Sequence, residues 1–420
     1  HCAVPVVGVN LWYHVGSRNE HPGRTGFAHL FEHLMFEGSA HVPPGRFDRL
    51  LEDAGGINNG STTADRTNYW ITVPAHALEL ALYLEADRMG WLPPAMTKDK
   101  LEAQRSVVMN ERRQSYDNRP YGLASERLLA ALYPPNHPYH WPTIGSMEDI
   151  RAATLDDVMA FFHMYYIPGN ATLAVAGAVR SDTVRELVER YFGEIPCGSP
   201  PPKVWAPAAR LEADRHEVLE DDVHLARLYM LWHSPAAFAP GDAELDMAAH
   251  VLTRGKMGRV YKTLIYERQI AQEVISYQRS GQLGSSFVVI VTARPGTSLR
   301  ELEGHVRGEI EAIATHGIST EELERATNLT EAAFVDELQT VGGFGGRADR
   351  LNLYAFHTGD PGYLARDLAR YASMRADAVR DATSAWLLQP CVVLDVVPKR
   401  SHQSIVDRRQ DESPRRIPDE

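Results

Sequence analysis

The stretch AHLFEHLMFEG, residues 28–38, determines how the rest of this chain is interpreted. In a helix, residues four apart lie on one face, so His29 and His33 can point at one ion while Glu32 lies beside them. The remaining apolar side chains would hold the helix inside the protein, and they are Leu30, Phe31, Leu34, Met35 and Phe36. The stretch therefore predicts a buried helix that places two imidazoles in a dry pocket.

Two neutral imidazoles and one further protein ligand are what a catalytic zinc site requires, with water in the fourth position. A carboxylate beside that water can accept its proton and later pass it to a leaving amine, and Glu32 is placed for this role. The order His-x-x-Glu-His is itself a known catalytic motif, the inverse of the commoner zinc-protease order. The alternative is that His29 and His33 are ordinary helix histidines and that Glu32 is solvated.

The third ligand is expected in TKDKLEAQRSVVMNERRQSYDN, residues 97–118, which has the pattern of a helix with Thr97 as its N-cap. One stripe at the helical period consists of Leu101, Gln104, Val108, Glu111 and Ser115. A lone carboxylate in such a stripe is costly unless it binds a metal or a base, so Glu111 is the candidate ligand. Arg112 falls on another face, where we expect it to be solvated or to support the ligands without touching the metal.

Three stretches carry a family resemblance: HLFEHLMFEGS, GGINNGSTTADRTNYW and RSVVMNERRQSYDNRPYG. Together, and in this order, they resemble the pitrilysin-type zinc peptidases, also called the insulinase or M16 family, and within it the bacterial members akin to the mitochondrial processing peptidase. The resemblance implies that His29, His33 and Glu111 bind one zinc ion and that Glu32 is the catalytic base. Many members have a second glutamate seven residues before the third ligand, whereas this chain has Gln104 there. We expect Gln104 and Arg112 to contact the ligand side chains without binding the metal.

The chain of 420 residues, 44% of them hydrophobic, can bury two ordinary domain cores. A proline-dense stretch that begins CGSPPPKVWAP at residue 197 is a natural linker. After it, the predicted elements at 225–232, 243–252, 286–292 and 298–314 repeat the order of those at 6–15, 28–38, 68–73 and 76–89. We therefore predict a catalytic domain at 1–195, a linker at 196–212, a homologous domain at 213–400 and a charged tail at 401–420.

The duplicated pattern predicts an α+β protein in which only the first copy keeps the metal motif. The resemblance implies that each domain is an antiparallel sheet covered by helices and that the two enclose a clam-like cavity. In the second copy, His250 is alone on an apolar face and is expected to be a packed core histidine. The glycine-rich stretch VGGFGGR at 341–347 has no strand before it, so we expect a mobile or closely packed loop rather than a phosphate site.

Other features bound the possible partners. The net charge of −12 provides no footprint for nucleic acid, and no apolar stretch has the length of a transmembrane helix. The three cysteines, Cys2, Cys197 and Cys391, show neither a disulfide framework nor zinc-ligand spacing. His137 and His140 lie in a proline-broken loop, which is poor support for a second metal pair. Because the chain begins within a strand-like stretch, we expect a leader or a first strand to precede it. We expect the protein to lie in the bacterial periplasm, with the cytoplasm as the alternative.

The sequence thus predicts a zinc endopeptidase for extended or unfolded peptides. A polar strand follows the metal helix and could add a substrate strand at its edge through backbone hydrogen bonds, using Asn58, Asn59, Gly60, Ser61 and Thr62. One alternative is a non-catalytic structural subunit of the same fold, but the His and Glu set is complete. Another is a zinc hydrolase of small amides, for which a duplicated half would be superfluous.

A partner subunit follows from a departure in the second half. In the family, the second domain commonly supplies an arginine and, seven residues on, a tyrosine that hold the substrate, whereas Ile265 and Gln272 stand at those positions here. Related bacterial and mitochondrial enzymes pair a zinc-bearing chain with a zinc-less chain that carries such residues. We therefore expect this chain to be the catalytic member of a heterodimer with a zinc-less homologue, and to form a homodimer when alone.

Overall fold

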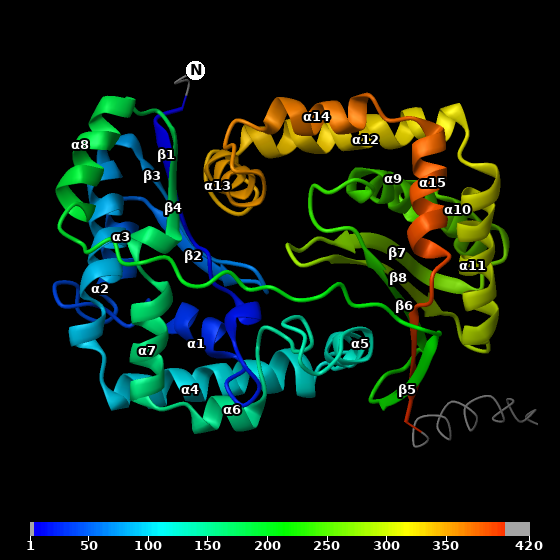
Figure 1. Cartoon of the computed structure of the whole chain (residues 1–420), viewed down its shortest axis with the longest axis horizontal. Coiled ribbons are helices and arrows are strands. Elements are labelled where there is room, and N and C mark those ends of the chain that lie inside the picture. Colours follow the sequence, from blue (N-terminus) through cyan, green and yellow to red (C-terminus); the bar gives the residue numbers. More distant parts are fainter. Residues whose placement is uncertain (1–3, 400–420) are drawn as a thin grey trace, which may run out of the picture.

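Two sheets with helices packed on them lie side by side in the computed structural model, which describes residues 4–399 (Figure 1). The first half of the chain builds one sheet and the second half builds the other. This arrangement confirms the prediction of two homologous α+β domains. The predicted tail at 401–420 and Cys2 lie outside the described residues.

The first sheet has the strand order β2-β3-β1-β4, and every neighbouring pair is antiparallel. Its strands are β1 (Val6–Tyr13), β2 (Ile57–Thr62), β3 (Thr67–Pro74) and β4 (Ala171–Gly177). The helices of this half are α1 (Phe27–Leu34), α2 (Arg46–Asp53), α3 (Leu78–Trp91), α4 (Lys98–Arg112), α5 (Ala124–Leu132), α6 (Met147–Ala152), α7 (Leu155–Tyr165) and α8 (Ser181–Phe192). Strand β2 is at the edge, so one side of its backbone has no neighbouring strand in residues 4–399.

The second sheet has the order β5-β9-β6-β8-β7, in which β9-β6-β8-β7 repeats the order β4-β1-β3-β2 of the first sheet. The strands are β5 (Arg215–Asp221), β6 (Arg227–Ser234), β7 (Ala271–Arg279), β8 (Ser285–Ala293) and β9 (Val392–Pro398). The helices are α9 (Asp242–Thr253), α10 (Arg259–Tyr261), α11 (Leu299–His316), α12 (Thr320–Gln339), α13 (Arg347–Thr358), α14 (Leu364–Ala372) and α15 (Ala376–Leu387). The expectation of purely antiparallel sheets is wrong for one pair, because β5 runs parallel to β9. Strand β5 enters from the linker and not from a hairpin, so nothing forces it to be antiparallel.

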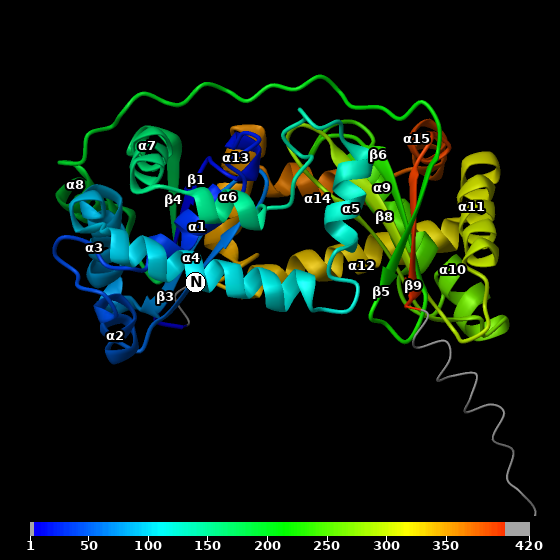
Figure 2. The same ribbon diagram turned by 90° about the horizontal axis from the view of Figure 1, so that it is seen from below.

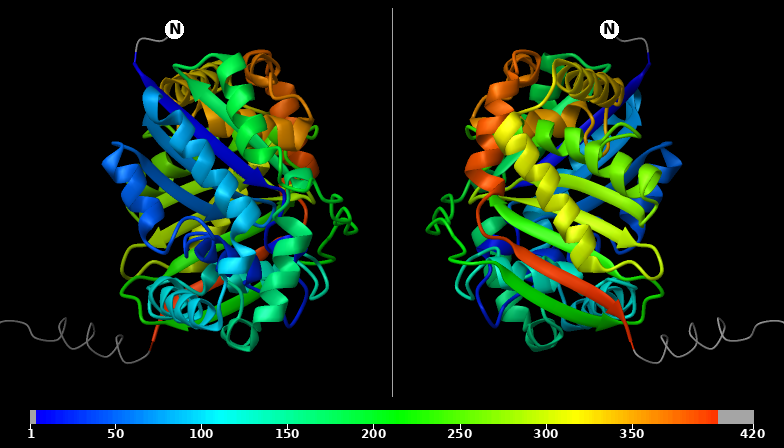
Figure 3. Two further views of the ribbon diagram at one scale, coloured as in Figure 1. Left: turned by 90° about the vertical axis from the view of Figure 1, so that its left-hand side faces the viewer. Right: turned by 90° about the vertical axis from the view of Figure 1, so that its right-hand side faces the viewer.

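Between α8 and β5, residues 193–214 contain no helix or strand, and the predicted linker at 196–212 lies within this segment. Figure 2 shows it running along one side of the molecule from the first half to the second. The end views show α3 and α8 on the outer side of the first sheet and α11 with α15 on the outer side of the second (Figure 3). The inner sides of both sheets therefore face the middle of the molecule.

Each half also covers part of the other. Helix α13 packs against β1 and β4 of the first sheet, where the Asn352 side-chain amide donates to the backbone oxygen of Asn10 (2.9 Å) and Trp12 Nε1 donates to Asp349 (2.8 Å). Helix α5 packs against β6 and β9 of the second sheet, and Leu128 and other apolar residues of α5 share a core with both strands. These contacts hold the two halves together around a shared interior.

The glycine-rich loop at 341–347 belongs to this junction. A Cβ atom at Gly8 would lie 2.7 Å from the Cα atom of Gly342, and a Cβ atom at Gly342 would lie 2.1 Å from Thr72 Oγ1. Only glycines allow such close approach of the loop to β1 and β3. The loop is thus closely packed, which is one of the two states expected from the sequence.

Helix starts test the capping predictions. Thr97 is the N-cap of α4, and its hydroxyl accepts a hydrogen bond from the backbone N–H of Lys100 (3.3 Å), as predicted. Helix α8 begins after Arg180, whose side chain makes no capping bond. Within residues 4–399, no helix combines the length and apolar character that crossing a bilayer requires.

Candidate metal centre

Helix α1 is held in the core by its apolar side. It begins after Gly26, whose left-handed backbone (φ 86°) turns the chain sharply into the helix. Leu30, Phe31 and Leu34 are fully buried, as the apolar spacing predicted. The opposite side carries the two histidines, so packing of the apolar side fixes where the imidazoles point.

The three predicted ligand atoms converge. His33 Nε2 lies 3.3 Å and His29 Nε2 lies 3.7 Å from Glu111 Oε2, and all three atoms lie within 4.8 Å of one another. Ligand atoms of a tetrahedral zinc ion, at bond lengths of roughly 2.1 Å, are about 3.4 Å apart, so one ion fits between them. No other group of three or more His, Cys, Asp or Glu side chains in residues 4–399 meets this condition.

The site is more open than expected. The side chains of His29 and His33 are 13% and 24% exposed, but that of Glu111 is 40% exposed. The prediction of a dry pocket is therefore wrong on the Glu111 side. A polar substrate has to reach the site, and this opening provides access.

The surroundings of the site favour a charged Glu111 carboxylate and a neutral His29 imidazole. Burial lowers the pKa of His29 to about 4, so this ring is neutral near pH 7. Burial also lowers the pKa of His33, but the hydrogen bond to Glu111 and the charges of Glu111 and Glu32 outweigh burial and raise it overall. The contact with His33 keeps the pKa of Glu111 below its usual value. The Glu111 carboxylate and the His33 imidazole therefore stabilise each other's charged forms at a distance of 3.3 Å.

Glu32 lies next to the ligands and is fixed by the edge strand. Thr62 Oγ1 on β2 donates a hydrogen bond to Glu32 Oε2 (2.6 Å). Gly60 passes so close that a Cβ atom there would lie 3.2 Å from both Cγ and Oε1 of Glu32. Burial raises the pKa of the Glu32 carboxyl, and the Thr62 hydroxyl counteracts this rise. The carboxylate is thus oriented by a donor and is a stronger base than an exposed glutamate.

The other residues predicted to contact substrate lie on the same edge strand. Asn58 donates from its side-chain amide to Asp48 (3.0 Å), the Asn59 side chain accepts from the backbone N–H of Gly60 (2.8 Å), and Ser61 donates to Asn68 (2.6 Å). These side-chain bonds leave the outer backbone edge of β2 without a partner strand in the described part of the chain. The geometry is what addition of a peptide strand requires, and the substrate role stays a prediction.

Gln104 and Arg112, the two residues expected to contact the ligands, differ in their positions. The Gln104 side chain donates to Glu37 Oε1 (2.5 Å) and contributes to the raised pKa of His33, so it lies beside a ligand, and its supporting role stays a prediction. Arg112 is buried, and it pairs with Glu126 (2.8 Å) and donates to the backbone oxygen of Gly145. Arg112 therefore anchors the end of α4 rather than a ligand, which corrects the prediction.

Glu20 is a structural part of the site that sequence reasoning missed. Its buried carboxylate accepts hydrogen bonds from the backbone N–H groups of Gly26 (2.9 Å) and Ala28 (2.8 Å), at the start of α1. Burial raises its pKa to about 8, although both bonds lower it. The loop that brings Glu20 back to the helix has no periodic signal, so its spacing from the motif could not have revealed the contact.

The rejected histidines are explained by packing. His137 is buried and stacks on Tyr133 with ring centroids 4.5 Å apart, and His140 Nδ1 lies 2.7 Å from the backbone oxygen of Tyr133. His250 on α9 is half-buried with Nδ1 3.3 Å from Thr330 Oγ1. Of the two cysteines in the described residues, Cys197 is exposed and Cys391 buried, and both are free.

Comparisons with known proteins agree with this geometry. Residues 3–141 match the family model described as "Insulinase (Peptidase family M16)", and residues 152–329 match "Peptidase M16 inactive domain". The chain is 32% identical over 340 residues to the zinc protease PqqE of Helicobacter pylori, which covers 80% of this chain and 76% of that protein. It is 22% identical over 338 residues to the uncharacterized zinc protease YmxG of Bacillus subtilis, with 80% of each covered.

Two solved structures have the same fold. A protease from Helicobacter pylori superposes with a TM-score of 0.86 at 28% identity, over 94% of both chains. A peptidase M16 inactive domain from Pseudomonas fluorescens superposes with a TM-score of 0.83 at 20% identity, again over 94% of both chains. The second likeness concerns the fold alone.

Proposed function

The chain belongs to the M16 peptidase family, and from this membership we propose that it is a zinc-dependent endopeptidase that hydrolyses extended or unfolded peptides. The observation that carries the proposal is the convergence of His29, His33 and Glu111 on one point, with Glu32 beside them. These three side chains would hold the metal, and zinc bound there would supply Lewis-acid polarisation of a carbonyl and activation of water.

Glu32 performs the proton transfers. Its carboxylate accepts a proton from the attacking water and donates it to the departing amine, which would otherwise leave as an unstable anion. Burial raises the pKa of Glu32, which suits a group that must both take and give a proton near neutral pH. The Thr62 hydroxyl binds Oε2 and leaves Oε1 without a hydrogen bond to the described residues. Oε1 is therefore the oxygen available to the water.

Strand β2 is proposed to hold the peptide. A substrate strand paired with the free edge of β2 would use only backbone hydrogen bonds, so the binding would tolerate many sequences. Because Gly60 and Thr62 lie against Glu32, a peptide along this edge passes the catalytic carboxylate. Asn58, Asn59 and Ser61 lie on the same strand and complete the proposed contact surface.

The test is hydrolysis of a long unstructured peptide by the purified, zinc-loaded chain. We expect internal cleavage, shown by product masses, that a chelator removes and added zinc restores. Release of single terminal residues would contradict the endopeptidase proposal. No hydrolysis by the zinc-loaded chain, alone or with a zinc-less homologue, would contradict the enzymatic proposal as a whole.

We also propose a zinc-less homologue as partner. Ile265 packs against the core of the second half, and Gln272 is exposed at the irregular start of β7, so neither supplies a charge or a ring to a substrate. A partner chain that contributes such residues should raise kcat/KM. Assays of the chain alone and mixed with a zinc-less homologue from the same source decide this, and full activity of a monomer that the homologue leaves unchanged would contradict it.

A further inference from the structure

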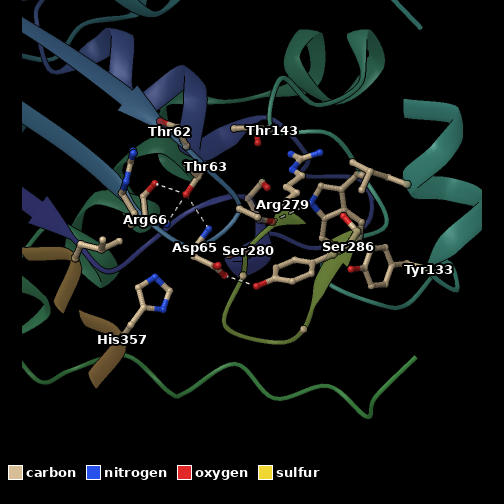
Figure 4. Close-up of a pocket in the computed structure, with 18 of the residues that line it drawn as sticks. Thr62, Thr63, Asp65, Arg66, Tyr133, Thr143, Arg279, Ser280, Ser286 and His357 are labelled. Atoms are coloured by element: carbon tan, nitrogen blue, oxygen red, sulfur yellow. Dashed lines mark hydrogen bonds between the residues drawn. The ribbon is translucent and has the colours of Figure 1, made fainter. Parts of the chain in front are cut away.

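A pocket of about 330 Å³ lies between the two halves. The β2–β3 turn, the loop after α5, the β7–β8 hairpin and α13 all contribute side chains to it (Figure 4). Thr62 and Thr63, at the end of the edge strand, form part of its wall. Since Thr62 also binds Glu32, a peptide that runs along β2 past the catalytic carboxylate reaches this pocket.

Most charged groups in the pocket already have partners. Asp65 pairs with Arg18 (2.9 Å) and accepts from the backbone N–H of Gln282 (3.0 Å). Asp349 accepts from Trp12 Nε1 (2.8 Å), and the Arg66 guanidinium donates to the backbone oxygen of Ser61 (2.8 Å). These groups are occupied in holding the turn and the two halves together, so they are poorly placed to bind a ligand.

Arg279 is different. It is the last residue of β7, it is exposed, and its guanidinium makes no hydrogen bond or ion pair within residues 4–399. In Figure 4 its side chain is turned into the pocket toward Thr143. Arg279 also lines a smaller pocket together with Leu128 and Tyr277.

Arg279 is also close to the metal-binding region. Burial raises the pKa of Tyr116, Arg279 opposes this rise, and Glu111 adds to it, so the tyrosine lies near both charges. Tyr116 belongs to the short π-helix Arg113–Asp117, directly after the helix that carries Glu111. The second half therefore brings an unpaired positive charge to the neighbourhood of the site in the first half.

We propose that Arg279 binds a carboxylate of the peptide substrate, so that the enzyme favours peptides with an acidic group at one fixed distance from the cleaved bond. The inference rests on the proposed peptidase function. The guanidinium matches a carboxylate in shape and charge and can donate two parallel hydrogen bonds to it. The carboxylate is that of an aspartate or glutamate side chain, or the carboxyl end of the peptide.

The test uses quenched fluorescent peptides derived from one neutral sequence. A single Asp is moved along the peptide and compared with Asn at each position, and the parent is made with a free and with an amidated carboxyl end. We expect kcat/KM to be roughly tenfold higher for the carboxylate at one position, as for one charge-assisted hydrogen-bonded pair. A preference for internal Asp identifies a side chain as the ligand, and a preference removed by amidation identifies the terminal carboxylate.

Variants assign the preference to the residue. Arg279→Gln should remove it and leave cleavage of the amidated neutral parent, which carries no carboxylate, within about twofold of wild type, and Arg279→Glu should favour Lys at the same position. Arg300→Gln, an exposed arginine on α11, is the matched control and should keep the preference. A wild type without any preference, or a preference that survives in Arg279→Gln, would overturn the inference.

Failure of the proposed function has a different signature. If the zinc-loaded wild type cleaves no peptide, the neutral parent included, the peptidase proposal fails. Binding of the same Asp and Asn peptides to Glu32→Gln protein, measured by fluorescence anisotropy, then tests Arg279 without turnover. Tighter binding of the Asp peptide that Arg279→Gln abolishes supports the inference, and equal binding overturns it.

Discussion

Helices α1 and α9 occupy corresponding places in the two halves, yet only one of them builds a metal centre. Each begins after a left-handed glycine, Gly26 (φ 86°) or Gly241 (φ 94°). Helix α1 contacts edge strand β2 and helix α4, and α9 contacts edge strand β7 and helix α12. The backbone frame is therefore the same, and the difference lies in the side chains that meet there.

Around α9, at the corresponding place in the second half, the polar side chains form hydrogen bonds with one another. Asp246 on α9 accepts from the Gln278 side chain on β7 (3.0 Å) and from the Tyr371 hydroxyl (2.8 Å), and His250 Nδ1 is 3.3 Å from Thr330 Oγ1 on α12. In the first site, one oxygen of Glu32 binds Thr62, and the imidazoles face a carboxylate. The comparison shows that the duplicated fold brings a helix, a strand edge and a second helix together in both halves. Metal binding also requires side-chain nitrogen and oxygen atoms that are not used in hydrogen bonds within the protein.

The largest expected effect separates the two carboxylates. Glu32→Gln is nearly isosteric but cannot accept a proton, so kcat should fall by about 10²- to 10⁴-fold while zinc and fold are retained. Asp246→Asn, the matched change in the second site, should leave kcat unchanged. Peptide hydrolysis and metal content are measured on both variants, and near-normal turnover by zinc-replete Glu32→Gln would reject the base role.

The next largest effect is expected for Gln104, which lies beside the ligand His33. Gln104→Ala removes the amide that contributes to the raised pKa of His33, and loss of a partner behind a ligand typically costs about 10- to 100-fold in metal affinity. Competition titrations with a chelator measure the affinity. Gln114→Ala, an exposed residue just after α4, is the control and should bind zinc like wild type. Equal affinity in the two variants would show that Gln104 does not support the site.

Asp246 in the second half should make the free energy of unfolding depend on pH. Burial and the nearby Asp242 raise the pKa of Asp246 to about 6, so the folded protein holds this proton more tightly than the unfolded chain. The stability it contributes is complete below about pH 4 and is lost as the pH rises through 6. Between pH 4 and pH 8, the free energy of unfolding of Asp246→Asn should therefore gain about 2 kcal/mol relative to wild type.

Urea unfolding at several pH values provides the measurement for Asp246. Asp182→Asn, at an exposed position on α8, is the control and should follow the wild-type pH dependence. Parallel pH curves for wild type and Asp246→Asn would contradict the assignment. Such a result would mean that Gln278 and Tyr371 keep the carboxylate charged at all these pH values.

The smallest expected effect concerns the strand that orients the base. Thr62→Val removes the donor to Glu32, so kcat should fall roughly tenfold with little change in KM. Because this donor lowers the pKa of Glu32, its loss should also move the acidic limb of the pH–rate profile to higher pH. Thr330→Val makes the same change beside His250 and should alter neither quantity. An unchanged acidic limb in Thr62→Val would mean that the hydroxyl does not act on Glu32.

The helical periodicity of the sequence was sufficient to predict the ligand residues, which lie on helices α1 and α4. The spacing of His29 and His33 and the stripe containing Glu111 predicted groups that the structure brings within ligand distance. The bond from Thr62 to Glu32 and the cap from Glu20 could not be predicted, because they depend on how strand β2 and the loop before α1 pack against this helix. The pairing of Arg112 with Glu126 and the parallel strand β5 were missed for the same reason, since each depends on a partner outside its own helix or strand.

The central claim is that His29, His33 and Glu111 hold one zinc ion, and the metal content of Glu111→Gln tests it most directly. The amide keeps the shape of the side chain but is a far weaker ligand than the carboxylate. We predict one zinc per chain in the wild type and a content well below one in Glu111→Gln purified in parallel. Stoichiometric zinc in that variant would contradict the account.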